Sequence, residues 1–117
     1  MNIYNRMPEL IHELAHTYCG GKWVAVGGGG YDIWKVVPRA WSLLWLEMSD
    51  HPLKKKLKNH PLTPLPDEWI RRWQPQAPVT LPSEWLDDLS RWEAIPRRDE
   101  ITAKNRETLA VALQDMP

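Results

Sequence analysis

The residues best suited to chemistry in this chain are four consecutive glycines, Gly27 to Gly30, and the tyrosine that follows them, Tyr31. An ordered glycine gives up more backbone entropy than any other residue, so this run indicates a left-handed backbone or close approach by another molecule. The run follows an apolar segment, residues 23–26. Open α/β sheets bind ligands beyond the carboxyl ends of their strands, so we expect Tyr31 to lie in a functional loop.

A second motif lies near the N-terminus, where residues 12–16 read His-Glu-Leu-Ala-His and match the H-E-x-x-H pattern of zinc peptidases. On a helix, His12 and His16 share one face and could chelate zinc, with Glu13 as the general base. The apolar residues of this segment lie on the opposite side, which predicts that the three polar side chains point to solvent. No third ligand appears at the spacing that those families use. We therefore interpret the pair as solvated histidines, with a zinc peptidase as a minor alternative.

Other chemical patterns are incomplete. A P-loop requires Lys and Ser/Thr after its last glycine, but Tyr31 and Asp32 follow here, and the dinucleotide fingerprint lacks its third glycine. Cys19 has no His partner in sequence and is interpreted as a small buried residue at a helix end.

The elements that must position the glycine run are predicted from periodicity. A helix from about Pro8 to residue 18, with an apolar face centred on Leu14 and Tyr18, should end at Gly20 and Gly21. Residues 22–26 predict a short buried strand. This order of helix, strand, loop and helix is typical of one slice of a parallel α/β sheet, and no convincing second strand follows.

The second helix is expected over residues 33–48, with Asp32 as its N-cap and Pro38 near its start. Two apolar faces lie on opposite sides of it, so this helix should be covered on both sides. One face holds Trp34, Trp41, Trp45 and Met48, and the other holds Leu43 and Leu46.

Residues 49–66 are rich in proline and lysine and are interpreted as a solvated, flexible connection. The hexapeptide at 65–70, Leu-Pro-Asp-Glu-Trp-Ile, recurs imperfectly at 81–86 as Leu-Pro-Ser-Glu-Trp-Leu. Each copy predicts a short helix with a proline at its start and carboxylates in its first turn. A last helix is expected over 99–116, with Met116 in its apolar stripe. The tryptophans expected to hold the two short helices to another surface are Trp69, Trp73, Trp85 and Trp92.

Composition restricts the classes of function. The 117 residues carry 15 basic and 15 acidic side chains, so no field of one sign attracts nucleic acid or a membrane surface. The single cysteine excludes an intrachain disulfide and fits a cytoplasmic location. No apolar run approaches the length that spans a membrane.

Residues 27–41, Gly-Gly-Gly-Gly-Tyr-Asp-Ile-Trp-Lys-Val-Val-Pro-Arg-Ala-Trp, resemble the C-terminal segment of zinc-dependent histone deacetylase-like enzymes, above all the bacterial acetoin-utilisation deacetylases. The Leu-Pro-x-Glu-Trp elements and Ile-Pro-Arg-Arg at 95–98 are similar to the extension of those bacterial proteins. The resemblance implies a mainly α chain with one short strand, the C-terminal piece of an arginase/deacetylase-like parallel-sheet fold. Residues 1–50 would end the catalytic domain, and 51–117 would form a linker and a Trp/Pro-rich helical extension.

The resemblance also implies a reaction, hydrolysis of acetyl-lysine. Tyr31 would donate a hydrogen bond to the substrate oxygen as it becomes an oxyanion, and Gly29 and Gly30 would line the acyl-lysine channel. The complete enzyme would hold zinc through two Asp and one His. No Asp-x-His pair occurs here, so we expect this chain to bind no catalytic zinc and to be inactive alone. The position of Arg39 departs from that of the family's arginine, and no site role is carried over to it.

The implied partners are the remaining N-terminal part of the deacetylase domain and, as substrate, an acetylated metabolic protein. A function of another class stays open, in which the chain is a non-catalytic interaction module whose Trp/Pro-rich half docks on a partner.

Overall fold

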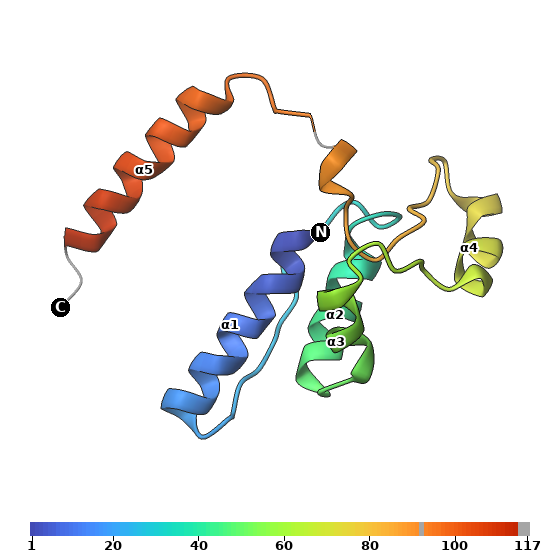
Figure 1. Cartoon of the computed structure of the whole chain (residues 1–117), viewed down its shortest axis with the longest axis horizontal. Coiled ribbons are helices and arrows are strands. Elements are labelled where there is room, and N and C mark those ends of the chain that lie inside the picture. The colour runs from blue at the N-terminus through green and yellow to red at the C-terminus, as the bar shows by residue number, and fades with distance from the viewer. Residues whose placement is uncertain (92, 115–117) are drawn as a thin grey trace.

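The computed structural model describes residues 1–91 and 93–114, and these residues are mainly helical (Figure 1). This confirms the expected helical class, whereas the expected short strand is absent from the described residues. The helices are α1 (Asn2–Cys19), α2 (Val37–Met48), α3 (Pro52–Asn59), α4 (Asp67–Trp73) and α5 (Arg98–Gln114), with two short 3-10 helices, η1 (Gln74–Gln76) and η2 (Leu89–Arg91).

Residues 22–26 have no regular secondary structure, and they pair with no other segment in the described part of the chain. The prediction of a buried strand is therefore wrong for this structure, because a strand requires a neighbour for its backbone N–H and C=O groups. Val24 and Val26 are 86% and 85% exposed for the same reason.

α1 begins at Asn2, earlier than expected, and carries Pro8 in its interior. It ends as predicted at Gly20, which adopts the left-handed conformation with φ of 58° and donates its N–H to the carbonyl of Ala15. α1 packs against α2, and its buried residues are Pro8 and Ala15. The face predicted to be buried is exposed instead, with Leu14 at 56% and Tyr18 at 79%.

α2 begins at Val37 rather than at residue 33, because residues 33–36 form a separate turn. Asp32 caps that turn: its side-chain Oδ1 accepts from the N–H of Lys35 at 2.8 Å, and its carbonyl accepts from Val37 at 3.0 Å. Pro38 lies in the first turn as expected.

The core forms on one side of α2 only. The prediction of cover on both sides is half right, since Trp41, Trp45 and Met48 are all more than 40% exposed. The buried cluster consists of Leu43, Leu46, Leu57 and Leu86, with Met1, Leu53 and Trp85 packed against it.

The lysine-rich connection is partly helical, contrary to the interpretation of residues 49–66 as flexible. His51 caps α3, its Nδ1 accepting from the N–H of Leu53 at 3.2 Å. Leu57 and Lys54 are buried on the inner face of α3. The Lys54 side chain is therefore not solvated, and its ammonium lies 3.3 Å from Glu47.

The two copies of the hexapeptide fold differently. The first forms α4 as predicted, but the second is not helical, which corrects the expected pair of helices. The backbone of the second copy is already used in an antiparallel bridge: Leu65 donates to the carbonyl of Ser83 at 2.8 Å, and Trp85 donates to that of Thr63 at 3.0 Å. A helix there would break both bonds. Trp92 lies outside the described residues.

α5 agrees with the last predicted helix, although Met116 lies outside the described residues. It packs against no other helix in the described part of the chain and leads away from the body (Figure 1). The radius of gyration is 17.0 Å, against about 13 Å for a compact domain of this length. None of the described helices is long and apolar enough to span a bilayer.

Candidate functional site

The glycine run has the backbone that its composition predicted. Gly29 and Gly30 have φ of 71° and 88°, a left-handed region in which a side chain is strained. A Cβ on Gly27 would lie 3.1 Å from Cζ2 of Trp41, and one on Gly30 would lie 3.1 Å from Cγ2 of Val37. Gly29 and Gly30 therefore favour glycine for their dihedral angles, and Gly27 and Gly30 favour it for their close approach to α2.

Tyr31 follows these glycines and is 93% exposed. This exposed fraction is larger than that of any other large apolar or aromatic side chain in the described residues. Its hydroxyl is reachable from solvent, and a neutral phenol can donate a hydrogen bond.

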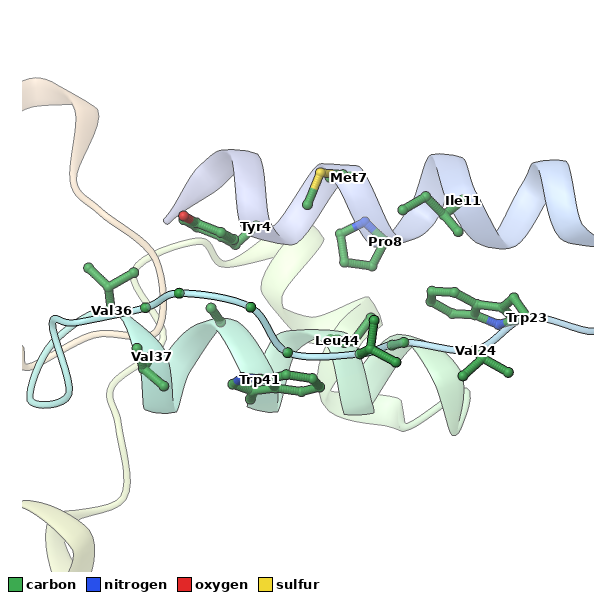
Figure 2. Close-up of a pocket in the computed structure, with 17 residues that line it drawn as sticks. Tyr4, Met7, Pro8, Ile11, Trp23, Val24, Val36, Val37, Trp41 and Leu44 are labelled. Atoms are coloured by element: carbon green, nitrogen blue, oxygen red, sulfur yellow. The ribbon is translucent and has the colours of Figure 1, made fainter.

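An apolar groove of about 540 Å³ lies beside the glycine run, between α1, residues 23–30 and α2 (Figure 2). Met7 and Ile11 face it from α1, and Trp41 and Leu44 face it from α2. Gly29 and Gly30 line the groove, whereas Tyr31 does not. The structure thus brings together the two glycines predicted to line a channel and places the phenol beyond the groove.

Residues 23–31 make no hydrogen bond to another backbone group in the described part of the chain. Along residues 23–26 the exposed and half-buried side chains alternate, and all four are apolar. A strand with apolar side chains on both faces is typical of the interior of a parallel sheet, where neighbours cover both. The segment therefore has the sequence of an internal strand but lacks the neighbours within these residues.

Within the histidine motif, His12 faces α2, which corrects the expectation that it points to solvent. Nδ1 of His12 lies 2.9 Å from Oε1 of Glu47 on α2, and its Nε2 lies 3.0 Å from Nε2 of His16. His16 and Glu13 are exposed, as expected. Among the described residues, no group of three or more His, Cys, Asp or Glu side chains could hold a metal ion. Cys19 is exposed and free, so its interpretation as a buried residue is wrong.

Arg39 is a buried residue to which sequence reasoning gave no role. Its Nε donates to the carbonyl of Lys35 at 2.7 Å, and its Nη1 donates to the carbonyl of Glu84 at 3.2 Å and lies 3.2 Å from Oδ1 of Asp87. Burial alone would raise the pKa of Asp87, but the N-terminal ammonium and the charge of Arg39 outweigh it and hold this pKa below its ordinary value. Arg39 therefore joins α2 to the Trp/Pro-rich extension. The sequence alone does not predict these contacts, because a single arginine in an amphipathic helix gives no sign of its distant partners.

Comparison with known proteins agrees with the resemblance seen in the glycine run. The chain is 54% identical over 97% of its length to the acetoin utilization protein AcuC of Bacillus subtilis, 43% identical over 90% to that of Staphylococcus xylosus, and 41% identical over 86% to that of Staphylococcus aureus. It spans only 27%, 26% and 24% of those proteins, about a quarter of their length.

No family model matches the chain, and no solved structure matches it. The resemblance to the bacterial acetoin-utilisation branch is confirmed by the curated relatives alone. Nearly the whole of this chain is homologous to a segment that makes up about a quarter of the length of these bacterial acetoin utilization proteins.

Proposed function

We propose that this chain is the C-terminal part of a zinc-dependent protein lysine deacetylase of the acetoin-utilisation type, and that it supplies the loop bearing Tyr31. The observation that carries the proposal is an exposed phenol that directly follows two glycines in the left-handed conformation. The similarity to bacterial acetoin utilization proteins supports the proposal, and the resemblance to histone deacetylase-like enzymes supplies the reaction.

The role proposed for Tyr31 is to donate a hydrogen bond to the oxygen of an acetyl-lysine amide as that oxygen gains negative charge. Such a donor lowers the barrier because it is stronger toward the oxyanion than toward the neutral carbonyl, and its loss costs about a hundred- to a thousandfold in rate. Gly29 and Gly30 would form part of the wall along the acyl-lysine chain, where a Cβ would narrow the channel.

The zinc that the resemblance implies does not fit this chain. The described residues lack a donor set of three or more metal-binding side chains. The ligands would belong to the remaining N-terminal part of the deacetylase domain, and no step through zinc is assigned to residues of this chain.

The test of Tyr31 is the Tyr31→Phe variant in the longer protein, or in this chain mixed with the N-terminal part. We expect kcat for hydrolysis of an acetylated peptide to fall about a hundred- to a thousandfold, with little change in KM, because only the transition state loses a hydrogen bond. Tyr18→Phe is the matched control, since Tyr18 is also exposed and also loses one hydroxyl. Equal activity of the Tyr31→Phe variant and the control would rule out the catalytic role.

The proposed partner is the part of the deacetylase domain that carries the neighbouring strands. Residues 23–30 have unpaired backbone, and residues 23–26 have apolar side chains on both faces, as described above. In this chain alone we expect their amides to exchange with D2O almost as fast as in an unfolded peptide, because they lack hydrogen bonds. Addition of the N-terminal part should slow that exchange by at least about a hundredfold, measured by mass spectrometry of fragments. Slow exchange in the isolated chain, or no slowing in the mixture, would contradict the pairing.

The interaction-module alternative has weaker support. Trp85 packs against the core cluster, and Trp69 and Trp85 line a small crevice against Pro38 of α2. These side chains are therefore partly used within the chain itself. An acetylated metabolic protein as substrate and a cytoplasmic location stay predictions from the resemblance and from composition.

A further inference from the structure

Two imidazole nitrogens meet on the face of α1 that packs toward α2. Nε2 of His12 and Nε2 of His16 are 3.0 Å apart, whereas their ring centroids are 4.8 Å apart. The two nitrogens are thus turned toward each other, as the spacing of four residues on one helix allows. The pair borders an open polar cavity of about 760 Å³, so water and small ions reach it.

The ring of His12 is held on two sides. Its Nδ1 lies 2.9 Å from Oε1 of Glu47, and the ring of Trp23 stacks on it with 6.1 Å between centroids. A carboxylate oxygen can only accept, so the contact with Glu47 places a proton on Nδ1 and leaves the Nε2 lone pair of neutral His12 directed at His16. A carboxylate behind a histidine is the arrangement that orients metal-binding imidazoles in proteins.

The supporting groups are themselves held in place. Oε2 of Glu47 lies 3.3 Å from Nζ of Lys54, and that ammonium donates to the Asn5 side chain at 2.7 Å. The ring of His16 lies against the backbone of Gly21, where an added Cβ would come within 2.9 Å of Cε1. The ring of His12 is therefore held by its neighbours, and the ring of His16 lies beside the turn at Gly21.

We propose that His12 and His16 form a two-imidazole chelate for a divalent transition metal with tetragonal geometry, Cu²⁺ in the first place. With metal–nitrogen distances of about 2.0–2.1 Å, ligands at right angles lie about 2.9 Å apart and tetrahedral ligands about 3.3 Å apart. The observed 3.0 Å is the length of a hydrogen bond between the two rings, and it is close to the separation that right-angled ligands require. Imidazole ligands at right angles suit Cu²⁺ and Ni²⁺, and Cu²⁺ binds most tightly among the divalent metals of the first row.

Water completes the coordination, because no third metal-binding side chain joins the pair within the described residues. Before binding, Nε2 of His16 carries the proton that it donates to Nε2 of His12. On binding, that proton moves to Nδ1 of His16 or to solvent, and Nε2 of each ring gives its lone pair to the metal. The site does not depend on the deacetylase proposal, since neither histidine is assigned a role in it.

The test is titration of the 117-residue chain, prepared without added histidines, with CuCl2 and followed by calorimetry and by electron paramagnetic resonance. We expect one Cu²⁺ per chain with two nitrogen ligands in the hyperfine pattern. His16→Ala should weaken binding by about a hundredfold or more, because the second ligand is no longer tethered to the first. Glu47→Gln should weaken it by about ten- to a hundredfold through loss of the outer carboxylate. His60→Ala is the matched control, since His60 is an exposed histidine elsewhere, and it should change nothing.

Each outcome decides the proposal. Unchanged Cu²⁺ affinity in the His16→Ala chain, or an equal loss in the His60→Ala chain, would overturn it. A hyperfine pattern with a single nitrogen would also overturn it, and would show that His12 and His16 only hydrogen-bond to each other. Because His16 is exposed, its replacement by Ala should leave the circular dichroism of the chain unchanged, which separates loss of a ligand from loss of the fold.

Discussion

The two halves of this chain's body use apolar side chains in opposite ways. In the region formed by α2, α3 and the antiparallel bridge between Pro64 and Glu84, Leu43 and Leu57 are no more than 1% exposed. Around the glycine run, Val24, Val26 and Tyr31 are at least 85% exposed. Apolar side chains are therefore buried in one region and left in water in the other. The first region finds partners for its backbone and side chains within the described residues, and the second does not.

The largest difference between the two regions is expected when a core leucine is truncated. Leu57→Ala should lower the free energy of unfolding of this chain by about 2–5 kcal/mol, because it removes a fully buried side chain and leaves a cavity. The measurement is urea denaturation followed by circular dichroism. Val26→Ala is the matched substitution in the open region, and we expect it to change the free energy of unfolding by less than about 0.5 kcal/mol, since Val26 is already in water.

The same Val26→Ala change should become costly once the proposed neighbouring strands are present. If the segment is an internal strand of the longer protein, Val26 is then buried, and its truncation should cost about 1–3 kcal/mol there. An equally small effect in the longer protein would mean that nothing covers this segment.

In this chain alone, the next largest effect after Leu57→Ala is expected at Arg39, which joins α2 to the extension. Arg39→Ala leaves the carbonyl groups of Glu84 and Trp85 and the carboxylate of Asp87 without this donor, and it should lower the free energy of unfolding by about 2–3 kcal/mol. Arg91→Ala is the control, because Arg91 is 79% exposed and its ion pair among the described residues is with the nearby Asp88; it should cost less than about 1 kcal/mol. Similar losses in both variants would show that Arg39 does not fasten the extension.

Local signals in the sequence were sufficient for part of this structure. Gly20 ends α1 where its left-handed conformation is needed, Pro38 lies in the first turn of α2, and the first hexapeptide forms α4. The glycine run also has the left-handed angles and close contacts that its composition indicated. Each of these depends on residues within a few positions of one another, and so a single sequence contains the information.

The errors concern features that depend on distant residues. Residues 22–26 have the composition of a strand, but strand formation is decided by a neighbour and not by the segment. The second hexapeptide is drawn into a bridge by Thr63 and Leu65. His12 faces α2 because Glu47 lies there to meet it, 35 residues away in sequence. Periodicity places residues on a face of a helix, but it does not say which face meets the rest of the chain.

The smallest predicted effect lies where the two regions meet, at Glu9 of α1. Its Oε1 lies 3.3 Å from Nζ of Lys54 on α3, and its Oε2 accepts from Arg6 at 2.6 Å. Burial alone would raise the pKa of Glu9, but the hydrogen bond from Arg6 and the charge of Lys54 outweigh it, and the pKa is lowered. A carboxyl group whose pKa is lower in the folded state stabilises that state above its unfolded pKa, and this stabilisation is lost as pH falls through the folded value.

Glu9→Gln should therefore lower the free energy of unfolding at pH 7 by less than about 1 kcal/mol, with no effect at pH values where Glu9 is protonated in both states. The measurement is urea denaturation at a series of pH values from 7 downward through the acid range. Glu13→Gln removes an exposed carboxylate one turn further along α1 and should change little at any pH. If the cost of Glu9→Gln persisted after protonation, the contact between α1 and α3 would depend on the shape of the side chain. Its disappearance on protonation would show that the charge of Glu9 contributes to the contact between α1 and α3.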